Sequence, residues 1–313
     1  MDRKSLLVIR GGAIGDFLLT LPAIRLLREA FPGCRLEIVG YRHICAIAGH
    51  RYYADTVRSI EYAPMAGFFN PRSILDPNLS EYFSGFGQVI SYLFDPDGIF
   101  ESNLQRCGVR HLISADPRVN DGDHAAIQLA RPIECLGLFL DDPAATLFPN
   151  DTDRLEAANL LRDVPGPFLV IHPGSGSDKK NWPLDRWIGL VSELTDSGHA
   201  ILAVGGECDA ARLQTLHAKF PEALTILEGV PLTTLAAVIE RASFFVGHDS
   251  GISHLAAAAG TRCLLLFGPT DPAVWAPRNP GVQVLAHPRG SLAEIPVADV
   301  LEHCRNLMET IPA

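Results

Sequence analysis

The chain has 313 residues, of which 47% are hydrophobic and 20% charged, the composition of a folded globular protein. This length exceeds that of a typical single domain, so we expect two domains. The net charge of −10 argues against a broad nucleic-acid-binding surface. Seven cysteines without a C-x-x-C spacing suggest neither a disulfide framework nor a zinc ribbon. The chain lacks any stretch of about 18 uncharged apolar residues, so we expect a cytoplasmic protein whose membrane contact is peripheral.

Charge is distributed unevenly along the chain. Residues 1–58 carry a net charge of +4, and the rest of the chain carries −14. A basic segment of this kind could bind an anionic partner, although scattered charges more often form a solvated surface.

In the first half, short β-branched runs alternate with helical patterns, as in the βαβ units of a parallel sheet. The predicted strands are residues 6–10, 36–40, 57–61, 89–94 and 111–114. A helix is expected between the first two strands, ending before Pro32, and Pro22 would kink it. Residues 63–77 are rich in Pro, Phe and Asn with little periodicity, which predicts a long surface loop.

The second half repeats this pattern after a Pro- and Gly-rich turn at residues 164–167. Its predicted strands are residues 168–172, 200–204, 225–227, 244–247, 263–267 and 283–285. An acidic helix at residues 152–162 is expected to bridge the halves. The predicted architecture is two α/β domains facing each other across a cleft. Because open α/β sheets bind ligands at the carboxyl ends of their strands, the polar clusters that follow the strands are the candidate sites.

The first cluster follows the first strand and reads Arg10-Gly11-Gly12-Ala13-Ile14-Gly15-Asp16. Its glycines permit positive φ and a close approach of the backbone to a ligand. The cluster does not match G-x-G-x-x-G, and the second strand does not end in an acidic residue, so a nicotinamide cofactor is disfavoured. Asp16 has two interpretations, the commoner one a helix N-cap and the other a general base.

The second cluster follows the strand at residues 168–172 and reads His172-Pro173-Gly174-Ser175-Gly176-Ser177-Asp178-Lys179-Lys180-Asn181-Trp182-Pro183. Small residues expose backbone N–H groups, and a nearby lysine supplies positive charge, a combination that binds phosphate. The segment is not a Walker sequence, and a solvated loop explains it about as well.

The third cluster is the most specific and reads Gly247-His248-Asp249-Ser250-Gly251-Ile252-Ser253-His254. Asp249 or Ser250 caps the helix that follows, whose first N–H groups and positive dipole end form an anion site. His254 could donate to the same anion. The spacing of His248, Asp249 and His254 matches no standard metal site, and Ser250 lacks the G-x-S-x-G context of a hydrolase nucleophile.

Two further segments follow strands of the second half. Residues 205–209 contain carboxylates that could accept hydrogen bonds from ribose hydroxyls, or that could stabilise the start of a helix. Residues 267–272 could line the same edge, although a rigid proline turn is a sufficient explanation.

In chain order, these segments resemble glycosyltransferase family 9, the ADP-heptose:lipopolysaccharide heptosyltransferases. The shared series is G-G-A-I-G-D before L-T-L-P-A-I-R-L-L, H-P-G-S with K-x-W-P, G-G-x-x-x-x-x-R-L, D-S-G-x-x-H-L-A-A-A-x-G, and L-F-G-P-T-D-P. The series extends from Leu6 to Pro272, and the ordered set is far more specific than any single motif.

The resemblance implies a GT-B fold of two Rossmann-like domains. It assigns residues 1–155 to an acceptor-binding domain and residues 156–290 to a nucleotide-sugar-binding domain. Residues 291–313 would hold a C-terminal helix that packs back towards the first domain. Residues 63–149 cannot be aligned with the family, and we expect acceptor specificity there.

The resemblance also implies roles for individual residues. Asp16 resembles the catalytic base, and the glycines beside it form a phosphate or acceptor loop, namely Gly11, Gly12 and Gly15. The ribose carboxylate is Glu207 or Asp209. The remaining donor contacts fall on Ser175, Lys180, Asp249, Ser250, Gly251 and His254.

The implied reaction is an inverting transfer of a sugar, heptose from ADP-heptose, onto a lipopolysaccharide core or a related anionic glycolipid at the inner face of the cytoplasmic membrane. Asp16 would deprotonate the acceptor, while Lys180, His254 and helix amides would stabilise the departing diphosphate. We expect no metal or other cofactor. The metal-diphosphate pattern D-x-D occurs only outside the inferred donor site, at residues 95–97, 121–123 and 151–153. Two alternatives are a nucleotide-sugar epimerase of the same architecture and a non-catalytic nucleotide-sugar-binding protein.

Overall fold

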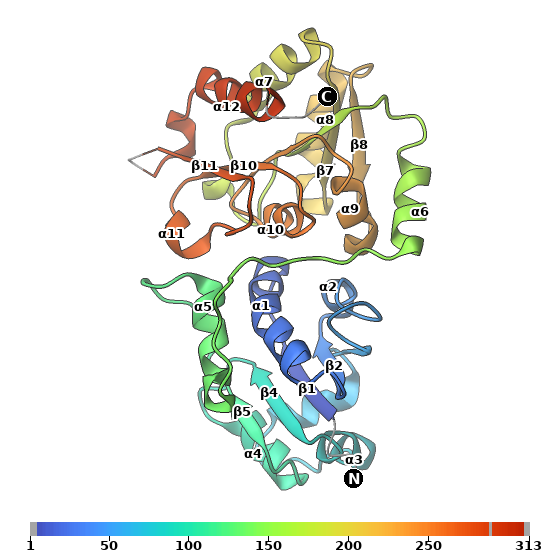
Figure 1. Ribbon diagram of the computed structural model, residues 1–313, viewed down its shortest axis with the longest axis vertical. Coiled ribbons are helices and arrows are strands. Elements are labelled where there is room, and N and C mark those ends of the chain that lie inside the picture. Colours follow the sequence, from blue (N-terminus) through green and yellow to red (C-terminus); the bar gives the residue numbers. More distant parts are fainter. Residues whose placement is uncertain (1–4, 288–289, 310–313) are drawn as a thin grey trace. The chain divides into compact units, whose positions relative to one another are not determined.

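A computed structural model describes residues 5–287 and 290–309 of the chain. The chain divides into two compact units, Met1–Pro143 and Ala144–Ala313. Each unit contains one parallel β-sheet with helices packed on it, as Figure 1 shows. Within the described ranges, we find no helix with the length and apolar character that a membrane span requires.

The first unit is built on a five-stranded sheet in the order β3-β2-β1-β4-β5. Every neighbouring pair is parallel, and β1 is buried along its whole length because it lies at the centre. Leu7 and Ile9 of β1 pack with aromatic side chains of η1, α3 and α4, and α1 packs on α5. The elements are β1 (Ser5–Arg10), α1 (Ile14–Ala30), β2 (Arg35–Gly40), α2 (Arg42–Cys45), β3 (Thr56–Ser59), η1 (Ala63–Phe69), α3 (Pro77–Ser84), β4 (Gln88–Tyr92), α4 (Ile99–Arg106), β5 (Leu112–Ser114), α5 (Ala125–Ala130) and η2 (Arg131–Leu136).

One expectation for this unit needs revision. Residues 63–77 are not simply a surface loop, because they include the 3-10 helix η1, whose Met65 and Phe68 are buried in the core. The segment lacks helical period because only these two side chains anchor it. Helix α1 runs from Ile14 to Ala30 with Pro22 inside it, so it ends before Pro32 as predicted.

The second unit is built on a six-stranded parallel sheet in the order β11-β10-β9-β6-β7-β8. All eleven predicted strands of the chain are present, with ends that differ from the predictions by at most two residues. The elements are α6 (Asp151–Leu160), β6 (Phe168–His172), η3 (Asp178–Lys180), α7 (Leu184–Asp196), β7 (Ala200–Gly205), η4 (Glu207–Asp209), α8 (Ala210–Lys219), β8 (Leu224–Glu228), α9 (Leu232–Ile239), β9 (Phe245–His248), α10 (Gly251–Ala258), β10 (Cys263–Phe267), α11 (Pro272–Trp275), β11 (Val282–Ala286), η5 (Leu292–Glu294) and α12 (Val297–Glu309).

Two helices near the ends of this unit pack on its other helices. Helix α12 buries Val300, Cys304 and Leu307 in the core of the second unit beside α7. The expectation that the same helix packs towards the first domain stays a prediction. Helix α6, expected as a bridge, belongs to the second unit and packs on α9, where Thr234 donates to Glu156 at 2.6 Å.

Candidate functional site

In the second unit, polar loops converge at the carboxyl ends of the adjacent strands β9 and β6. Lys180 Nζ lies 2.6 Å from Asp249 Oδ2, and Thr270 Oγ1 donates to the same oxygen at 2.5 Å. Asp249 is 8% exposed, whereas the Lys180 side chain is about one-third exposed. Asp249 therefore holds Lys180 at the sheet edge, and the remaining ammonium protons can face a ligand.

Helix α10 starts at this edge, and Ser250 is its N-cap. The Ser250 Oγ accepts from the Ser253 amide at 3.3 Å, which satisfies one N–H of the first turn. Gly251 is the first helical residue, and His254 lies in the first turn and is 7% exposed. The unpaired N–H groups and positive dipole end of the helix make this position favourable for an anion. Of the two predicted caps, Ser250 is confirmed.

The two carboxylates left open for ribose have different environments. Asp209 is buried, and its Oδ2 accepts from the Gly206 amide at 3.0 Å and lies 3.4 Å from His172 Nε2. Burial alone would raise the pKa of Asp209, but hydrogen bonds from His172 and Gly206 outweigh it, so its pKa lies below the usual value. Glu207 is exposed, and its carboxylate has no partner among the described residues. Glu207 is therefore the carboxylate that is available to a ligand.

The loop after β6 fits closely around Asp209. A Cβ built on Gly174 would lie 1.7 Å from Asp209 Oδ1, so a larger residue here would force the loop or the Asp209 carboxylate to shift. In the same loop, Ser175 Oγ donates to the Ser177 carbonyl at 2.8 Å and so shapes the turn that leads to Lys180.

His248 is a structural residue. Its Nδ1 donates to the Gly174 carbonyl at 3.1 Å, and its Nε2 accepts from the Trp182 amide at 2.9 Å and from Trp187 Nε1 at 3.3 Å. Burial lowers the pKa of His248 to about 3, so the imidazole is neutral. Among the residues that the structure describes, no group of three or more His, Cys, Asp and Glu side chains is arranged to hold a metal ion.

In the first unit, Asp16 lies at the carboxyl end of β1 but is not the N-cap. The helix begins two residues earlier, after Ala13, and Asp16 Oδ2 accepts from the Ala13 amide at 2.8 Å. Gly12 has a φ of +94°, and a Cβ there would lie 2.7 Å from Asp16 Oδ2. Gly11 precedes it beside Leu93, and Gly15 lies in the first turn of α1. The Asp16 side chain is 40% exposed, so a substrate can reach it.

Arg10 lies beneath Asp16 and is 4% exposed. Its guanidinium donates to Thr20 Oγ1 at 3.0 Å and to the Asp16 carbonyl at 3.2 Å, and it lies 3.9 Å from Asp16 Oδ1. Burial lowers the pKa of Arg10, and the Asp16 charge counteracts that shift. Arg10 thus fixes the first turn of α1, a role that the sequence did not reveal.

Asp16 lines a cavity of about 410 Å³, and four of the ten other residues that line it are aromatic. Tyr41, Phe69 and Phe94 contribute to it, and they are 37%, 46% and 56% exposed. Exposed rings that surround one carboxylate are typical of a binding site rather than of a plain surface.

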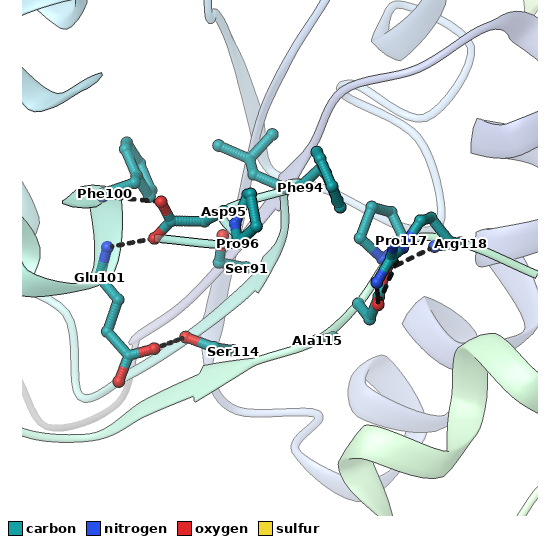
Figure 2. A pocket seen from close by; sticks show the side chains of 12 residues that line it. Ser91, Phe94, Asp95, Pro96, Phe100, Glu101, Ser114, Ala115, Pro117 and Arg118 are labelled. Carbon is teal, nitrogen blue, oxygen red and sulfur yellow. Dashed lines mark hydrogen bonds and ion pairs between the residues drawn. The ribbon is translucent and has the colours of Figure 1, made fainter. Parts of the chain in front are cut away.

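A smaller cavity of about 140 Å³ adjoins it and shares Leu93, Phe94 and Pro117 with it. Figure 2 shows its polar side chains: Asp95 accepts from the amides of Phe100 and Glu101, and Glu101 accepts from Ser114 Oγ at 2.6 Å. Asp95 is the first carboxylate of the D-x-D segment at residues 95–97, and it accepts hydrogen bonds from N–H groups at the start of α4 that have no partner within the helix. In the same cavity, the Arg118 guanidinium lies 4.7 Å from the centre of the Phe94 ring.

A third cavity, of about 450 Å³, lies at the ends of β2 and β3. Arg42 and Arg58 line it with Ser59 and Asn78. Arg58 lies 3.4 Å from the buried carboxylate of Glu37, whereas Arg42 is exposed and has no partner among the described residues. The neighbouring residues Tyr41 and Ile60 line the cavity at Asp16, so the two cavities adjoin.

Comparison with known proteins decides the family. The model of glycosyltransferase family 9 (heptosyltransferase) matches residues 122–304. The chain belongs to glycosyltransferase family 9. Lipopolysaccharide heptosyltransferase 1 of Salmonella typhimurium is 30% identical over 315 residues, covering 94% of this chain and 98% of the relative. The chain is therefore a glycosyltransferase, and this membership does not favour the epimerase or the binding protein.

Solved structures agree on the GT-B fold. A family 9 glycosyltransferase from Veillonella parvula has a TM-score of 0.81 at 18% identity, covering 98% of both chains. The E. coli heptosyltransferase WaaC with ADP has a TM-score of 0.73 at 21% identity, covering 97% of this chain and 99% of that one. The same enzyme with ADP-2-deoxy-2-fluoro heptose has a TM-score of 0.71 at 21% identity, covering 96% and 99%.

Proposed function

We propose that this glycosyltransferase transfers heptose from ADP-heptose to an anionic glycolipid of the lipopolysaccharide core, with inversion and with Asp16 as general base. The assignment of acceptor binding to the first unit and of donor binding to the second is part of this proposal. Family membership, the lipopolysaccharide heptosyltransferase relative and the ADP complexes of the E. coli enzyme support it.

The donor half rests on the contacts at the start of α10. A diphosphate there would accept hydrogen bonds from the amides at Ser250 and Gly251 and from Lys180, which Asp249 holds in place. Ser175 and His254 flank this position, and Glu207 would accept from the ribose hydroxyls. Because a lysine and helix amides supply the positive charge, the proposed step needs no metal ion.

The acceptor half rests on the aromatic cavity around Asp16. The rings of Tyr41, Phe69 and Phe94 would pack against the apolar faces of a sugar, while Asp16 receives the proton of the hydroxyl that attacks. Arg42 and Arg58 in the adjoining cavity would pair with a carboxylate or phosphate of the acceptor. This agrees with the positive charge of residues 1–58.

The reaction is a single displacement at the anomeric carbon of the donor. The acceptor oxygen forms the new glycosidic bond as its proton passes to Asp16, and the bond from the anomeric carbon to the diphosphate breaks. Attack from the opposite face inverts the configuration. The departing ADP carries the charge that Lys180 and the α10 amides stabilise.

The observation that carries the proposal is Asp16, a half-exposed carboxylate held by the Ala13 amide in an aromatic cavity. The test is Asp16→Asn, which keeps the shape but cannot accept the proton. Turnover should fall by about 10²-fold or more while ADP affinity is unchanged. Full activity in this variant would contradict the base assignment, and a changed sugar after incubation with donor alone would indicate an epimerase instead.

A further inference from the structure

The first unit contains a fourth cavity, of about 530 Å³, between the segment that follows η1 and the helix α4. Arg72 and Arg106 line it together with Asp97 and Ser102, and we call it the arginine cavity. Neither arginine forms an ion pair with a described residue. Both positive charges are therefore available to a ligand.

A buried amide holds Arg106 at the wall of the arginine cavity. Asn103 is 2% exposed, and its Nδ2 donates to the carbonyls of Phe68 and Asn70 at 2.9 Å and 3.1 Å. Its remaining polar atom, Oδ1, accepts from Arg106 Nη1 at 2.5 Å, and Arg106 Nη2 donates to the Ser73 carbonyl at 3.1 Å. Because these acceptors are neutral, they fix the guanidinium without cancelling its charge.

Arg72 has a backbone conformation that arginine rarely adopts. Its φ is +62°, and among the described residues His50 is the only other non-glycine with a positive φ. This conformation costs free energy in a residue that has a Cβ, whereas glycine adopts it readily. The Arg72 side chain is exposed and makes no hydrogen bond to a described residue. Contacts within the protein therefore do not explain an arginine here, whereas binding of an anion does.

The arginine cavity also contains one negative charge. Asp97 is exposed without a partner among the described residues, and Ser102 adds a hydroxyl. A carboxylate repels a plain anion but accepts hydrogen bonds from sugar hydroxyls. The start of α4 is not the anion site, because Asp95 already accepts from the amides of Phe100 and Glu101. The four side chains therefore fit a sugar that carries an acidic group better than they fit an inorganic anion.

One short segment borders both the arginine cavity and the cavity at Asp16. Phe69 lines the cavity at Asp16, whereas Pro71 and Arg72 line the arginine cavity. The Phe69 ring also stacks on Phe100 of α4, with ring centres 4.9 Å apart. Three residues of extended chain span at most about 11 Å, which limits the separation of Phe69 and Arg72 along the backbone. A saccharide with one hydroxyl at Asp16 can therefore place a second sugar at the arginines.

We propose that Arg72 and Arg106 form a second acceptor subsite, which binds an acidic sugar of the glycolipid other than the sugar that Asp16 activates. The inference rests on the proposed function, because it takes the acceptor to be an anionic glycolipid. The carboxylate or phosphate of this second sugar pairs with the two guanidinium groups, and its hydroxyls bond to Asp97 and Ser102.

The test measures transfer by the full chain from ADP-heptose to a heptose-free lipopolysaccharide glycolipid. Arg72→Gln removes a charge from a side chain without hydrogen bonds to described residues. The acceptor KM should rise by about tenfold, with kcat and ADP affinity unchanged, and Arg106→Gln should act likewise. Arg110→Gln is the matched control and should leave the KM unchanged, because Arg110 is exposed and lines none of the four cavities.

Arg72→Gly separates binding from folding. Glycine adopts a positive φ without strain, so the midpoint of urea denaturation should stay close to that of the wild type. The acceptor KM should nevertheless rise as much as in Arg72→Gln. A wild-type KM in both Arg72 variants would overturn the subsite.

Modified acceptors identify the acidic group. Phosphatase treatment removes phosphate from the glycolipid, and methyl esterification neutralises its carboxylates. The modification that removes the partner of Arg72 should raise the KM of the wild type without raising that of Arg72→Gln further, because both changes remove the same contact. Additive effects of Arg72→Gln with both modifications would refute the subsite while leaving Asp16 and the donor site intact. If the wild type transfers no heptose to this glycolipid, the proposed function is wrong, and this inference fails with it.

Discussion

Different types of side chain lie at the carboxyl edges of the two sheets. At the edge of the second sheet, Lys180, Asp249 and Thr270 meet at 2.6 Å and 2.5 Å, and small residues keep the backbone close. At the edge of the first sheet, Tyr41, Phe69 and Phe94 expose more than a third of their surface around Asp16. The edge of the second sheet is a polar cradle, formed by Lys180, Asp249, Thr270 and the loop after β6. The edge of the first sheet is an exposed surface rich in aromatic rings.

The difference follows from what each edge would bind. A diphosphate has fixed size and charge, so donors that are already in position bind it best. A glycolipid acceptor presents sugar rings and anionic groups over a longer distance, which suits rings and arginines spread over adjoining cavities. We therefore expect a substitution at the edge of the second sheet to impair binding more than a substitution at the edge of the first sheet.

The largest effect is expected for Gly174→Ala, which should disrupt the polar cradle. Its Cβ would lie 1.7 Å from Asp209 Oδ1, so the loop or the carboxylate must move. ADP binding should be lost, and the free energy of unfolding should fall by about 1–3 kcal/mol. Gly176→Ala in the same loop is the matched control, because its Cβ would meet no atom within 4 Å. Equal effects of the two substitutions on ADP affinity would refute a tightly fitted loop.

A second effect, on stability alone, concerns the second unit in acid. His248 is neutral in the folded state with a pKa of about 3, whereas an unfolded histidine takes up a proton below about pH 6.5. Stability is therefore highest above that pH and should decline by up to about 1.4 kcal/mol per pH unit as the pH falls towards 3.

This prediction can be measured by urea denaturation at several pH values with tryptophan fluorescence. Trp182, Trp187 and Trp275 are the three tryptophans of the chain and all belong to the second unit, so the signal reports on that unit. His199→Asn, at a partly exposed histidine of the same unit, should keep the slope. A slope unchanged in His248→Asn would show that His248 does not cause the decline.

The smallest effect is expected for Phe94→Ala at the aromatic edge. Loss of one stacking ring should raise the KM for the glycolipid acceptor by about fivefold to tenfold, with ADP affinity unchanged. Phe139→Ala is the matched control, because Phe139 is 64% exposed and lines none of the cavities described here. An unchanged acceptor KM in Phe94→Ala would remove the ring from the proposed acceptor site.

Much of the fold was predictable, because runs of buried β-branched and leucine residues are a local signal. Strands β1 and β10 were found within one residue of their bounds. The 3-10 helix η1 was not predicted. Its packing depends on side chains from distant elements, such as Phe100 of α4.

For the candidate site, the sequence indicated which loops matter but not how their side chains pair. Ser250 was a predicted cap because an N-cap precedes its helix directly. Asp16 was placed at the helix start, yet its contact with the Ala13 amide depends on where the helix begins. The contacts of His172 were missed because Asp209 and Ser250 lie 37 and 78 residues further along the chain.

His248 also ties the loop after β6 to the interior of the second unit. The same imidazole bonds the Gly174 carbonyl, the Trp182 amide and the Trp187 indole. A molecule that loses this tryptophan packing also loses the loop geometry. If this loop binds the donor, as proposed, nucleotide binding and correct folding are lost together. A resin that carries ADP should therefore retain properly folded chains and let misfolded ones pass, which would make affinity chromatography a check on sample quality.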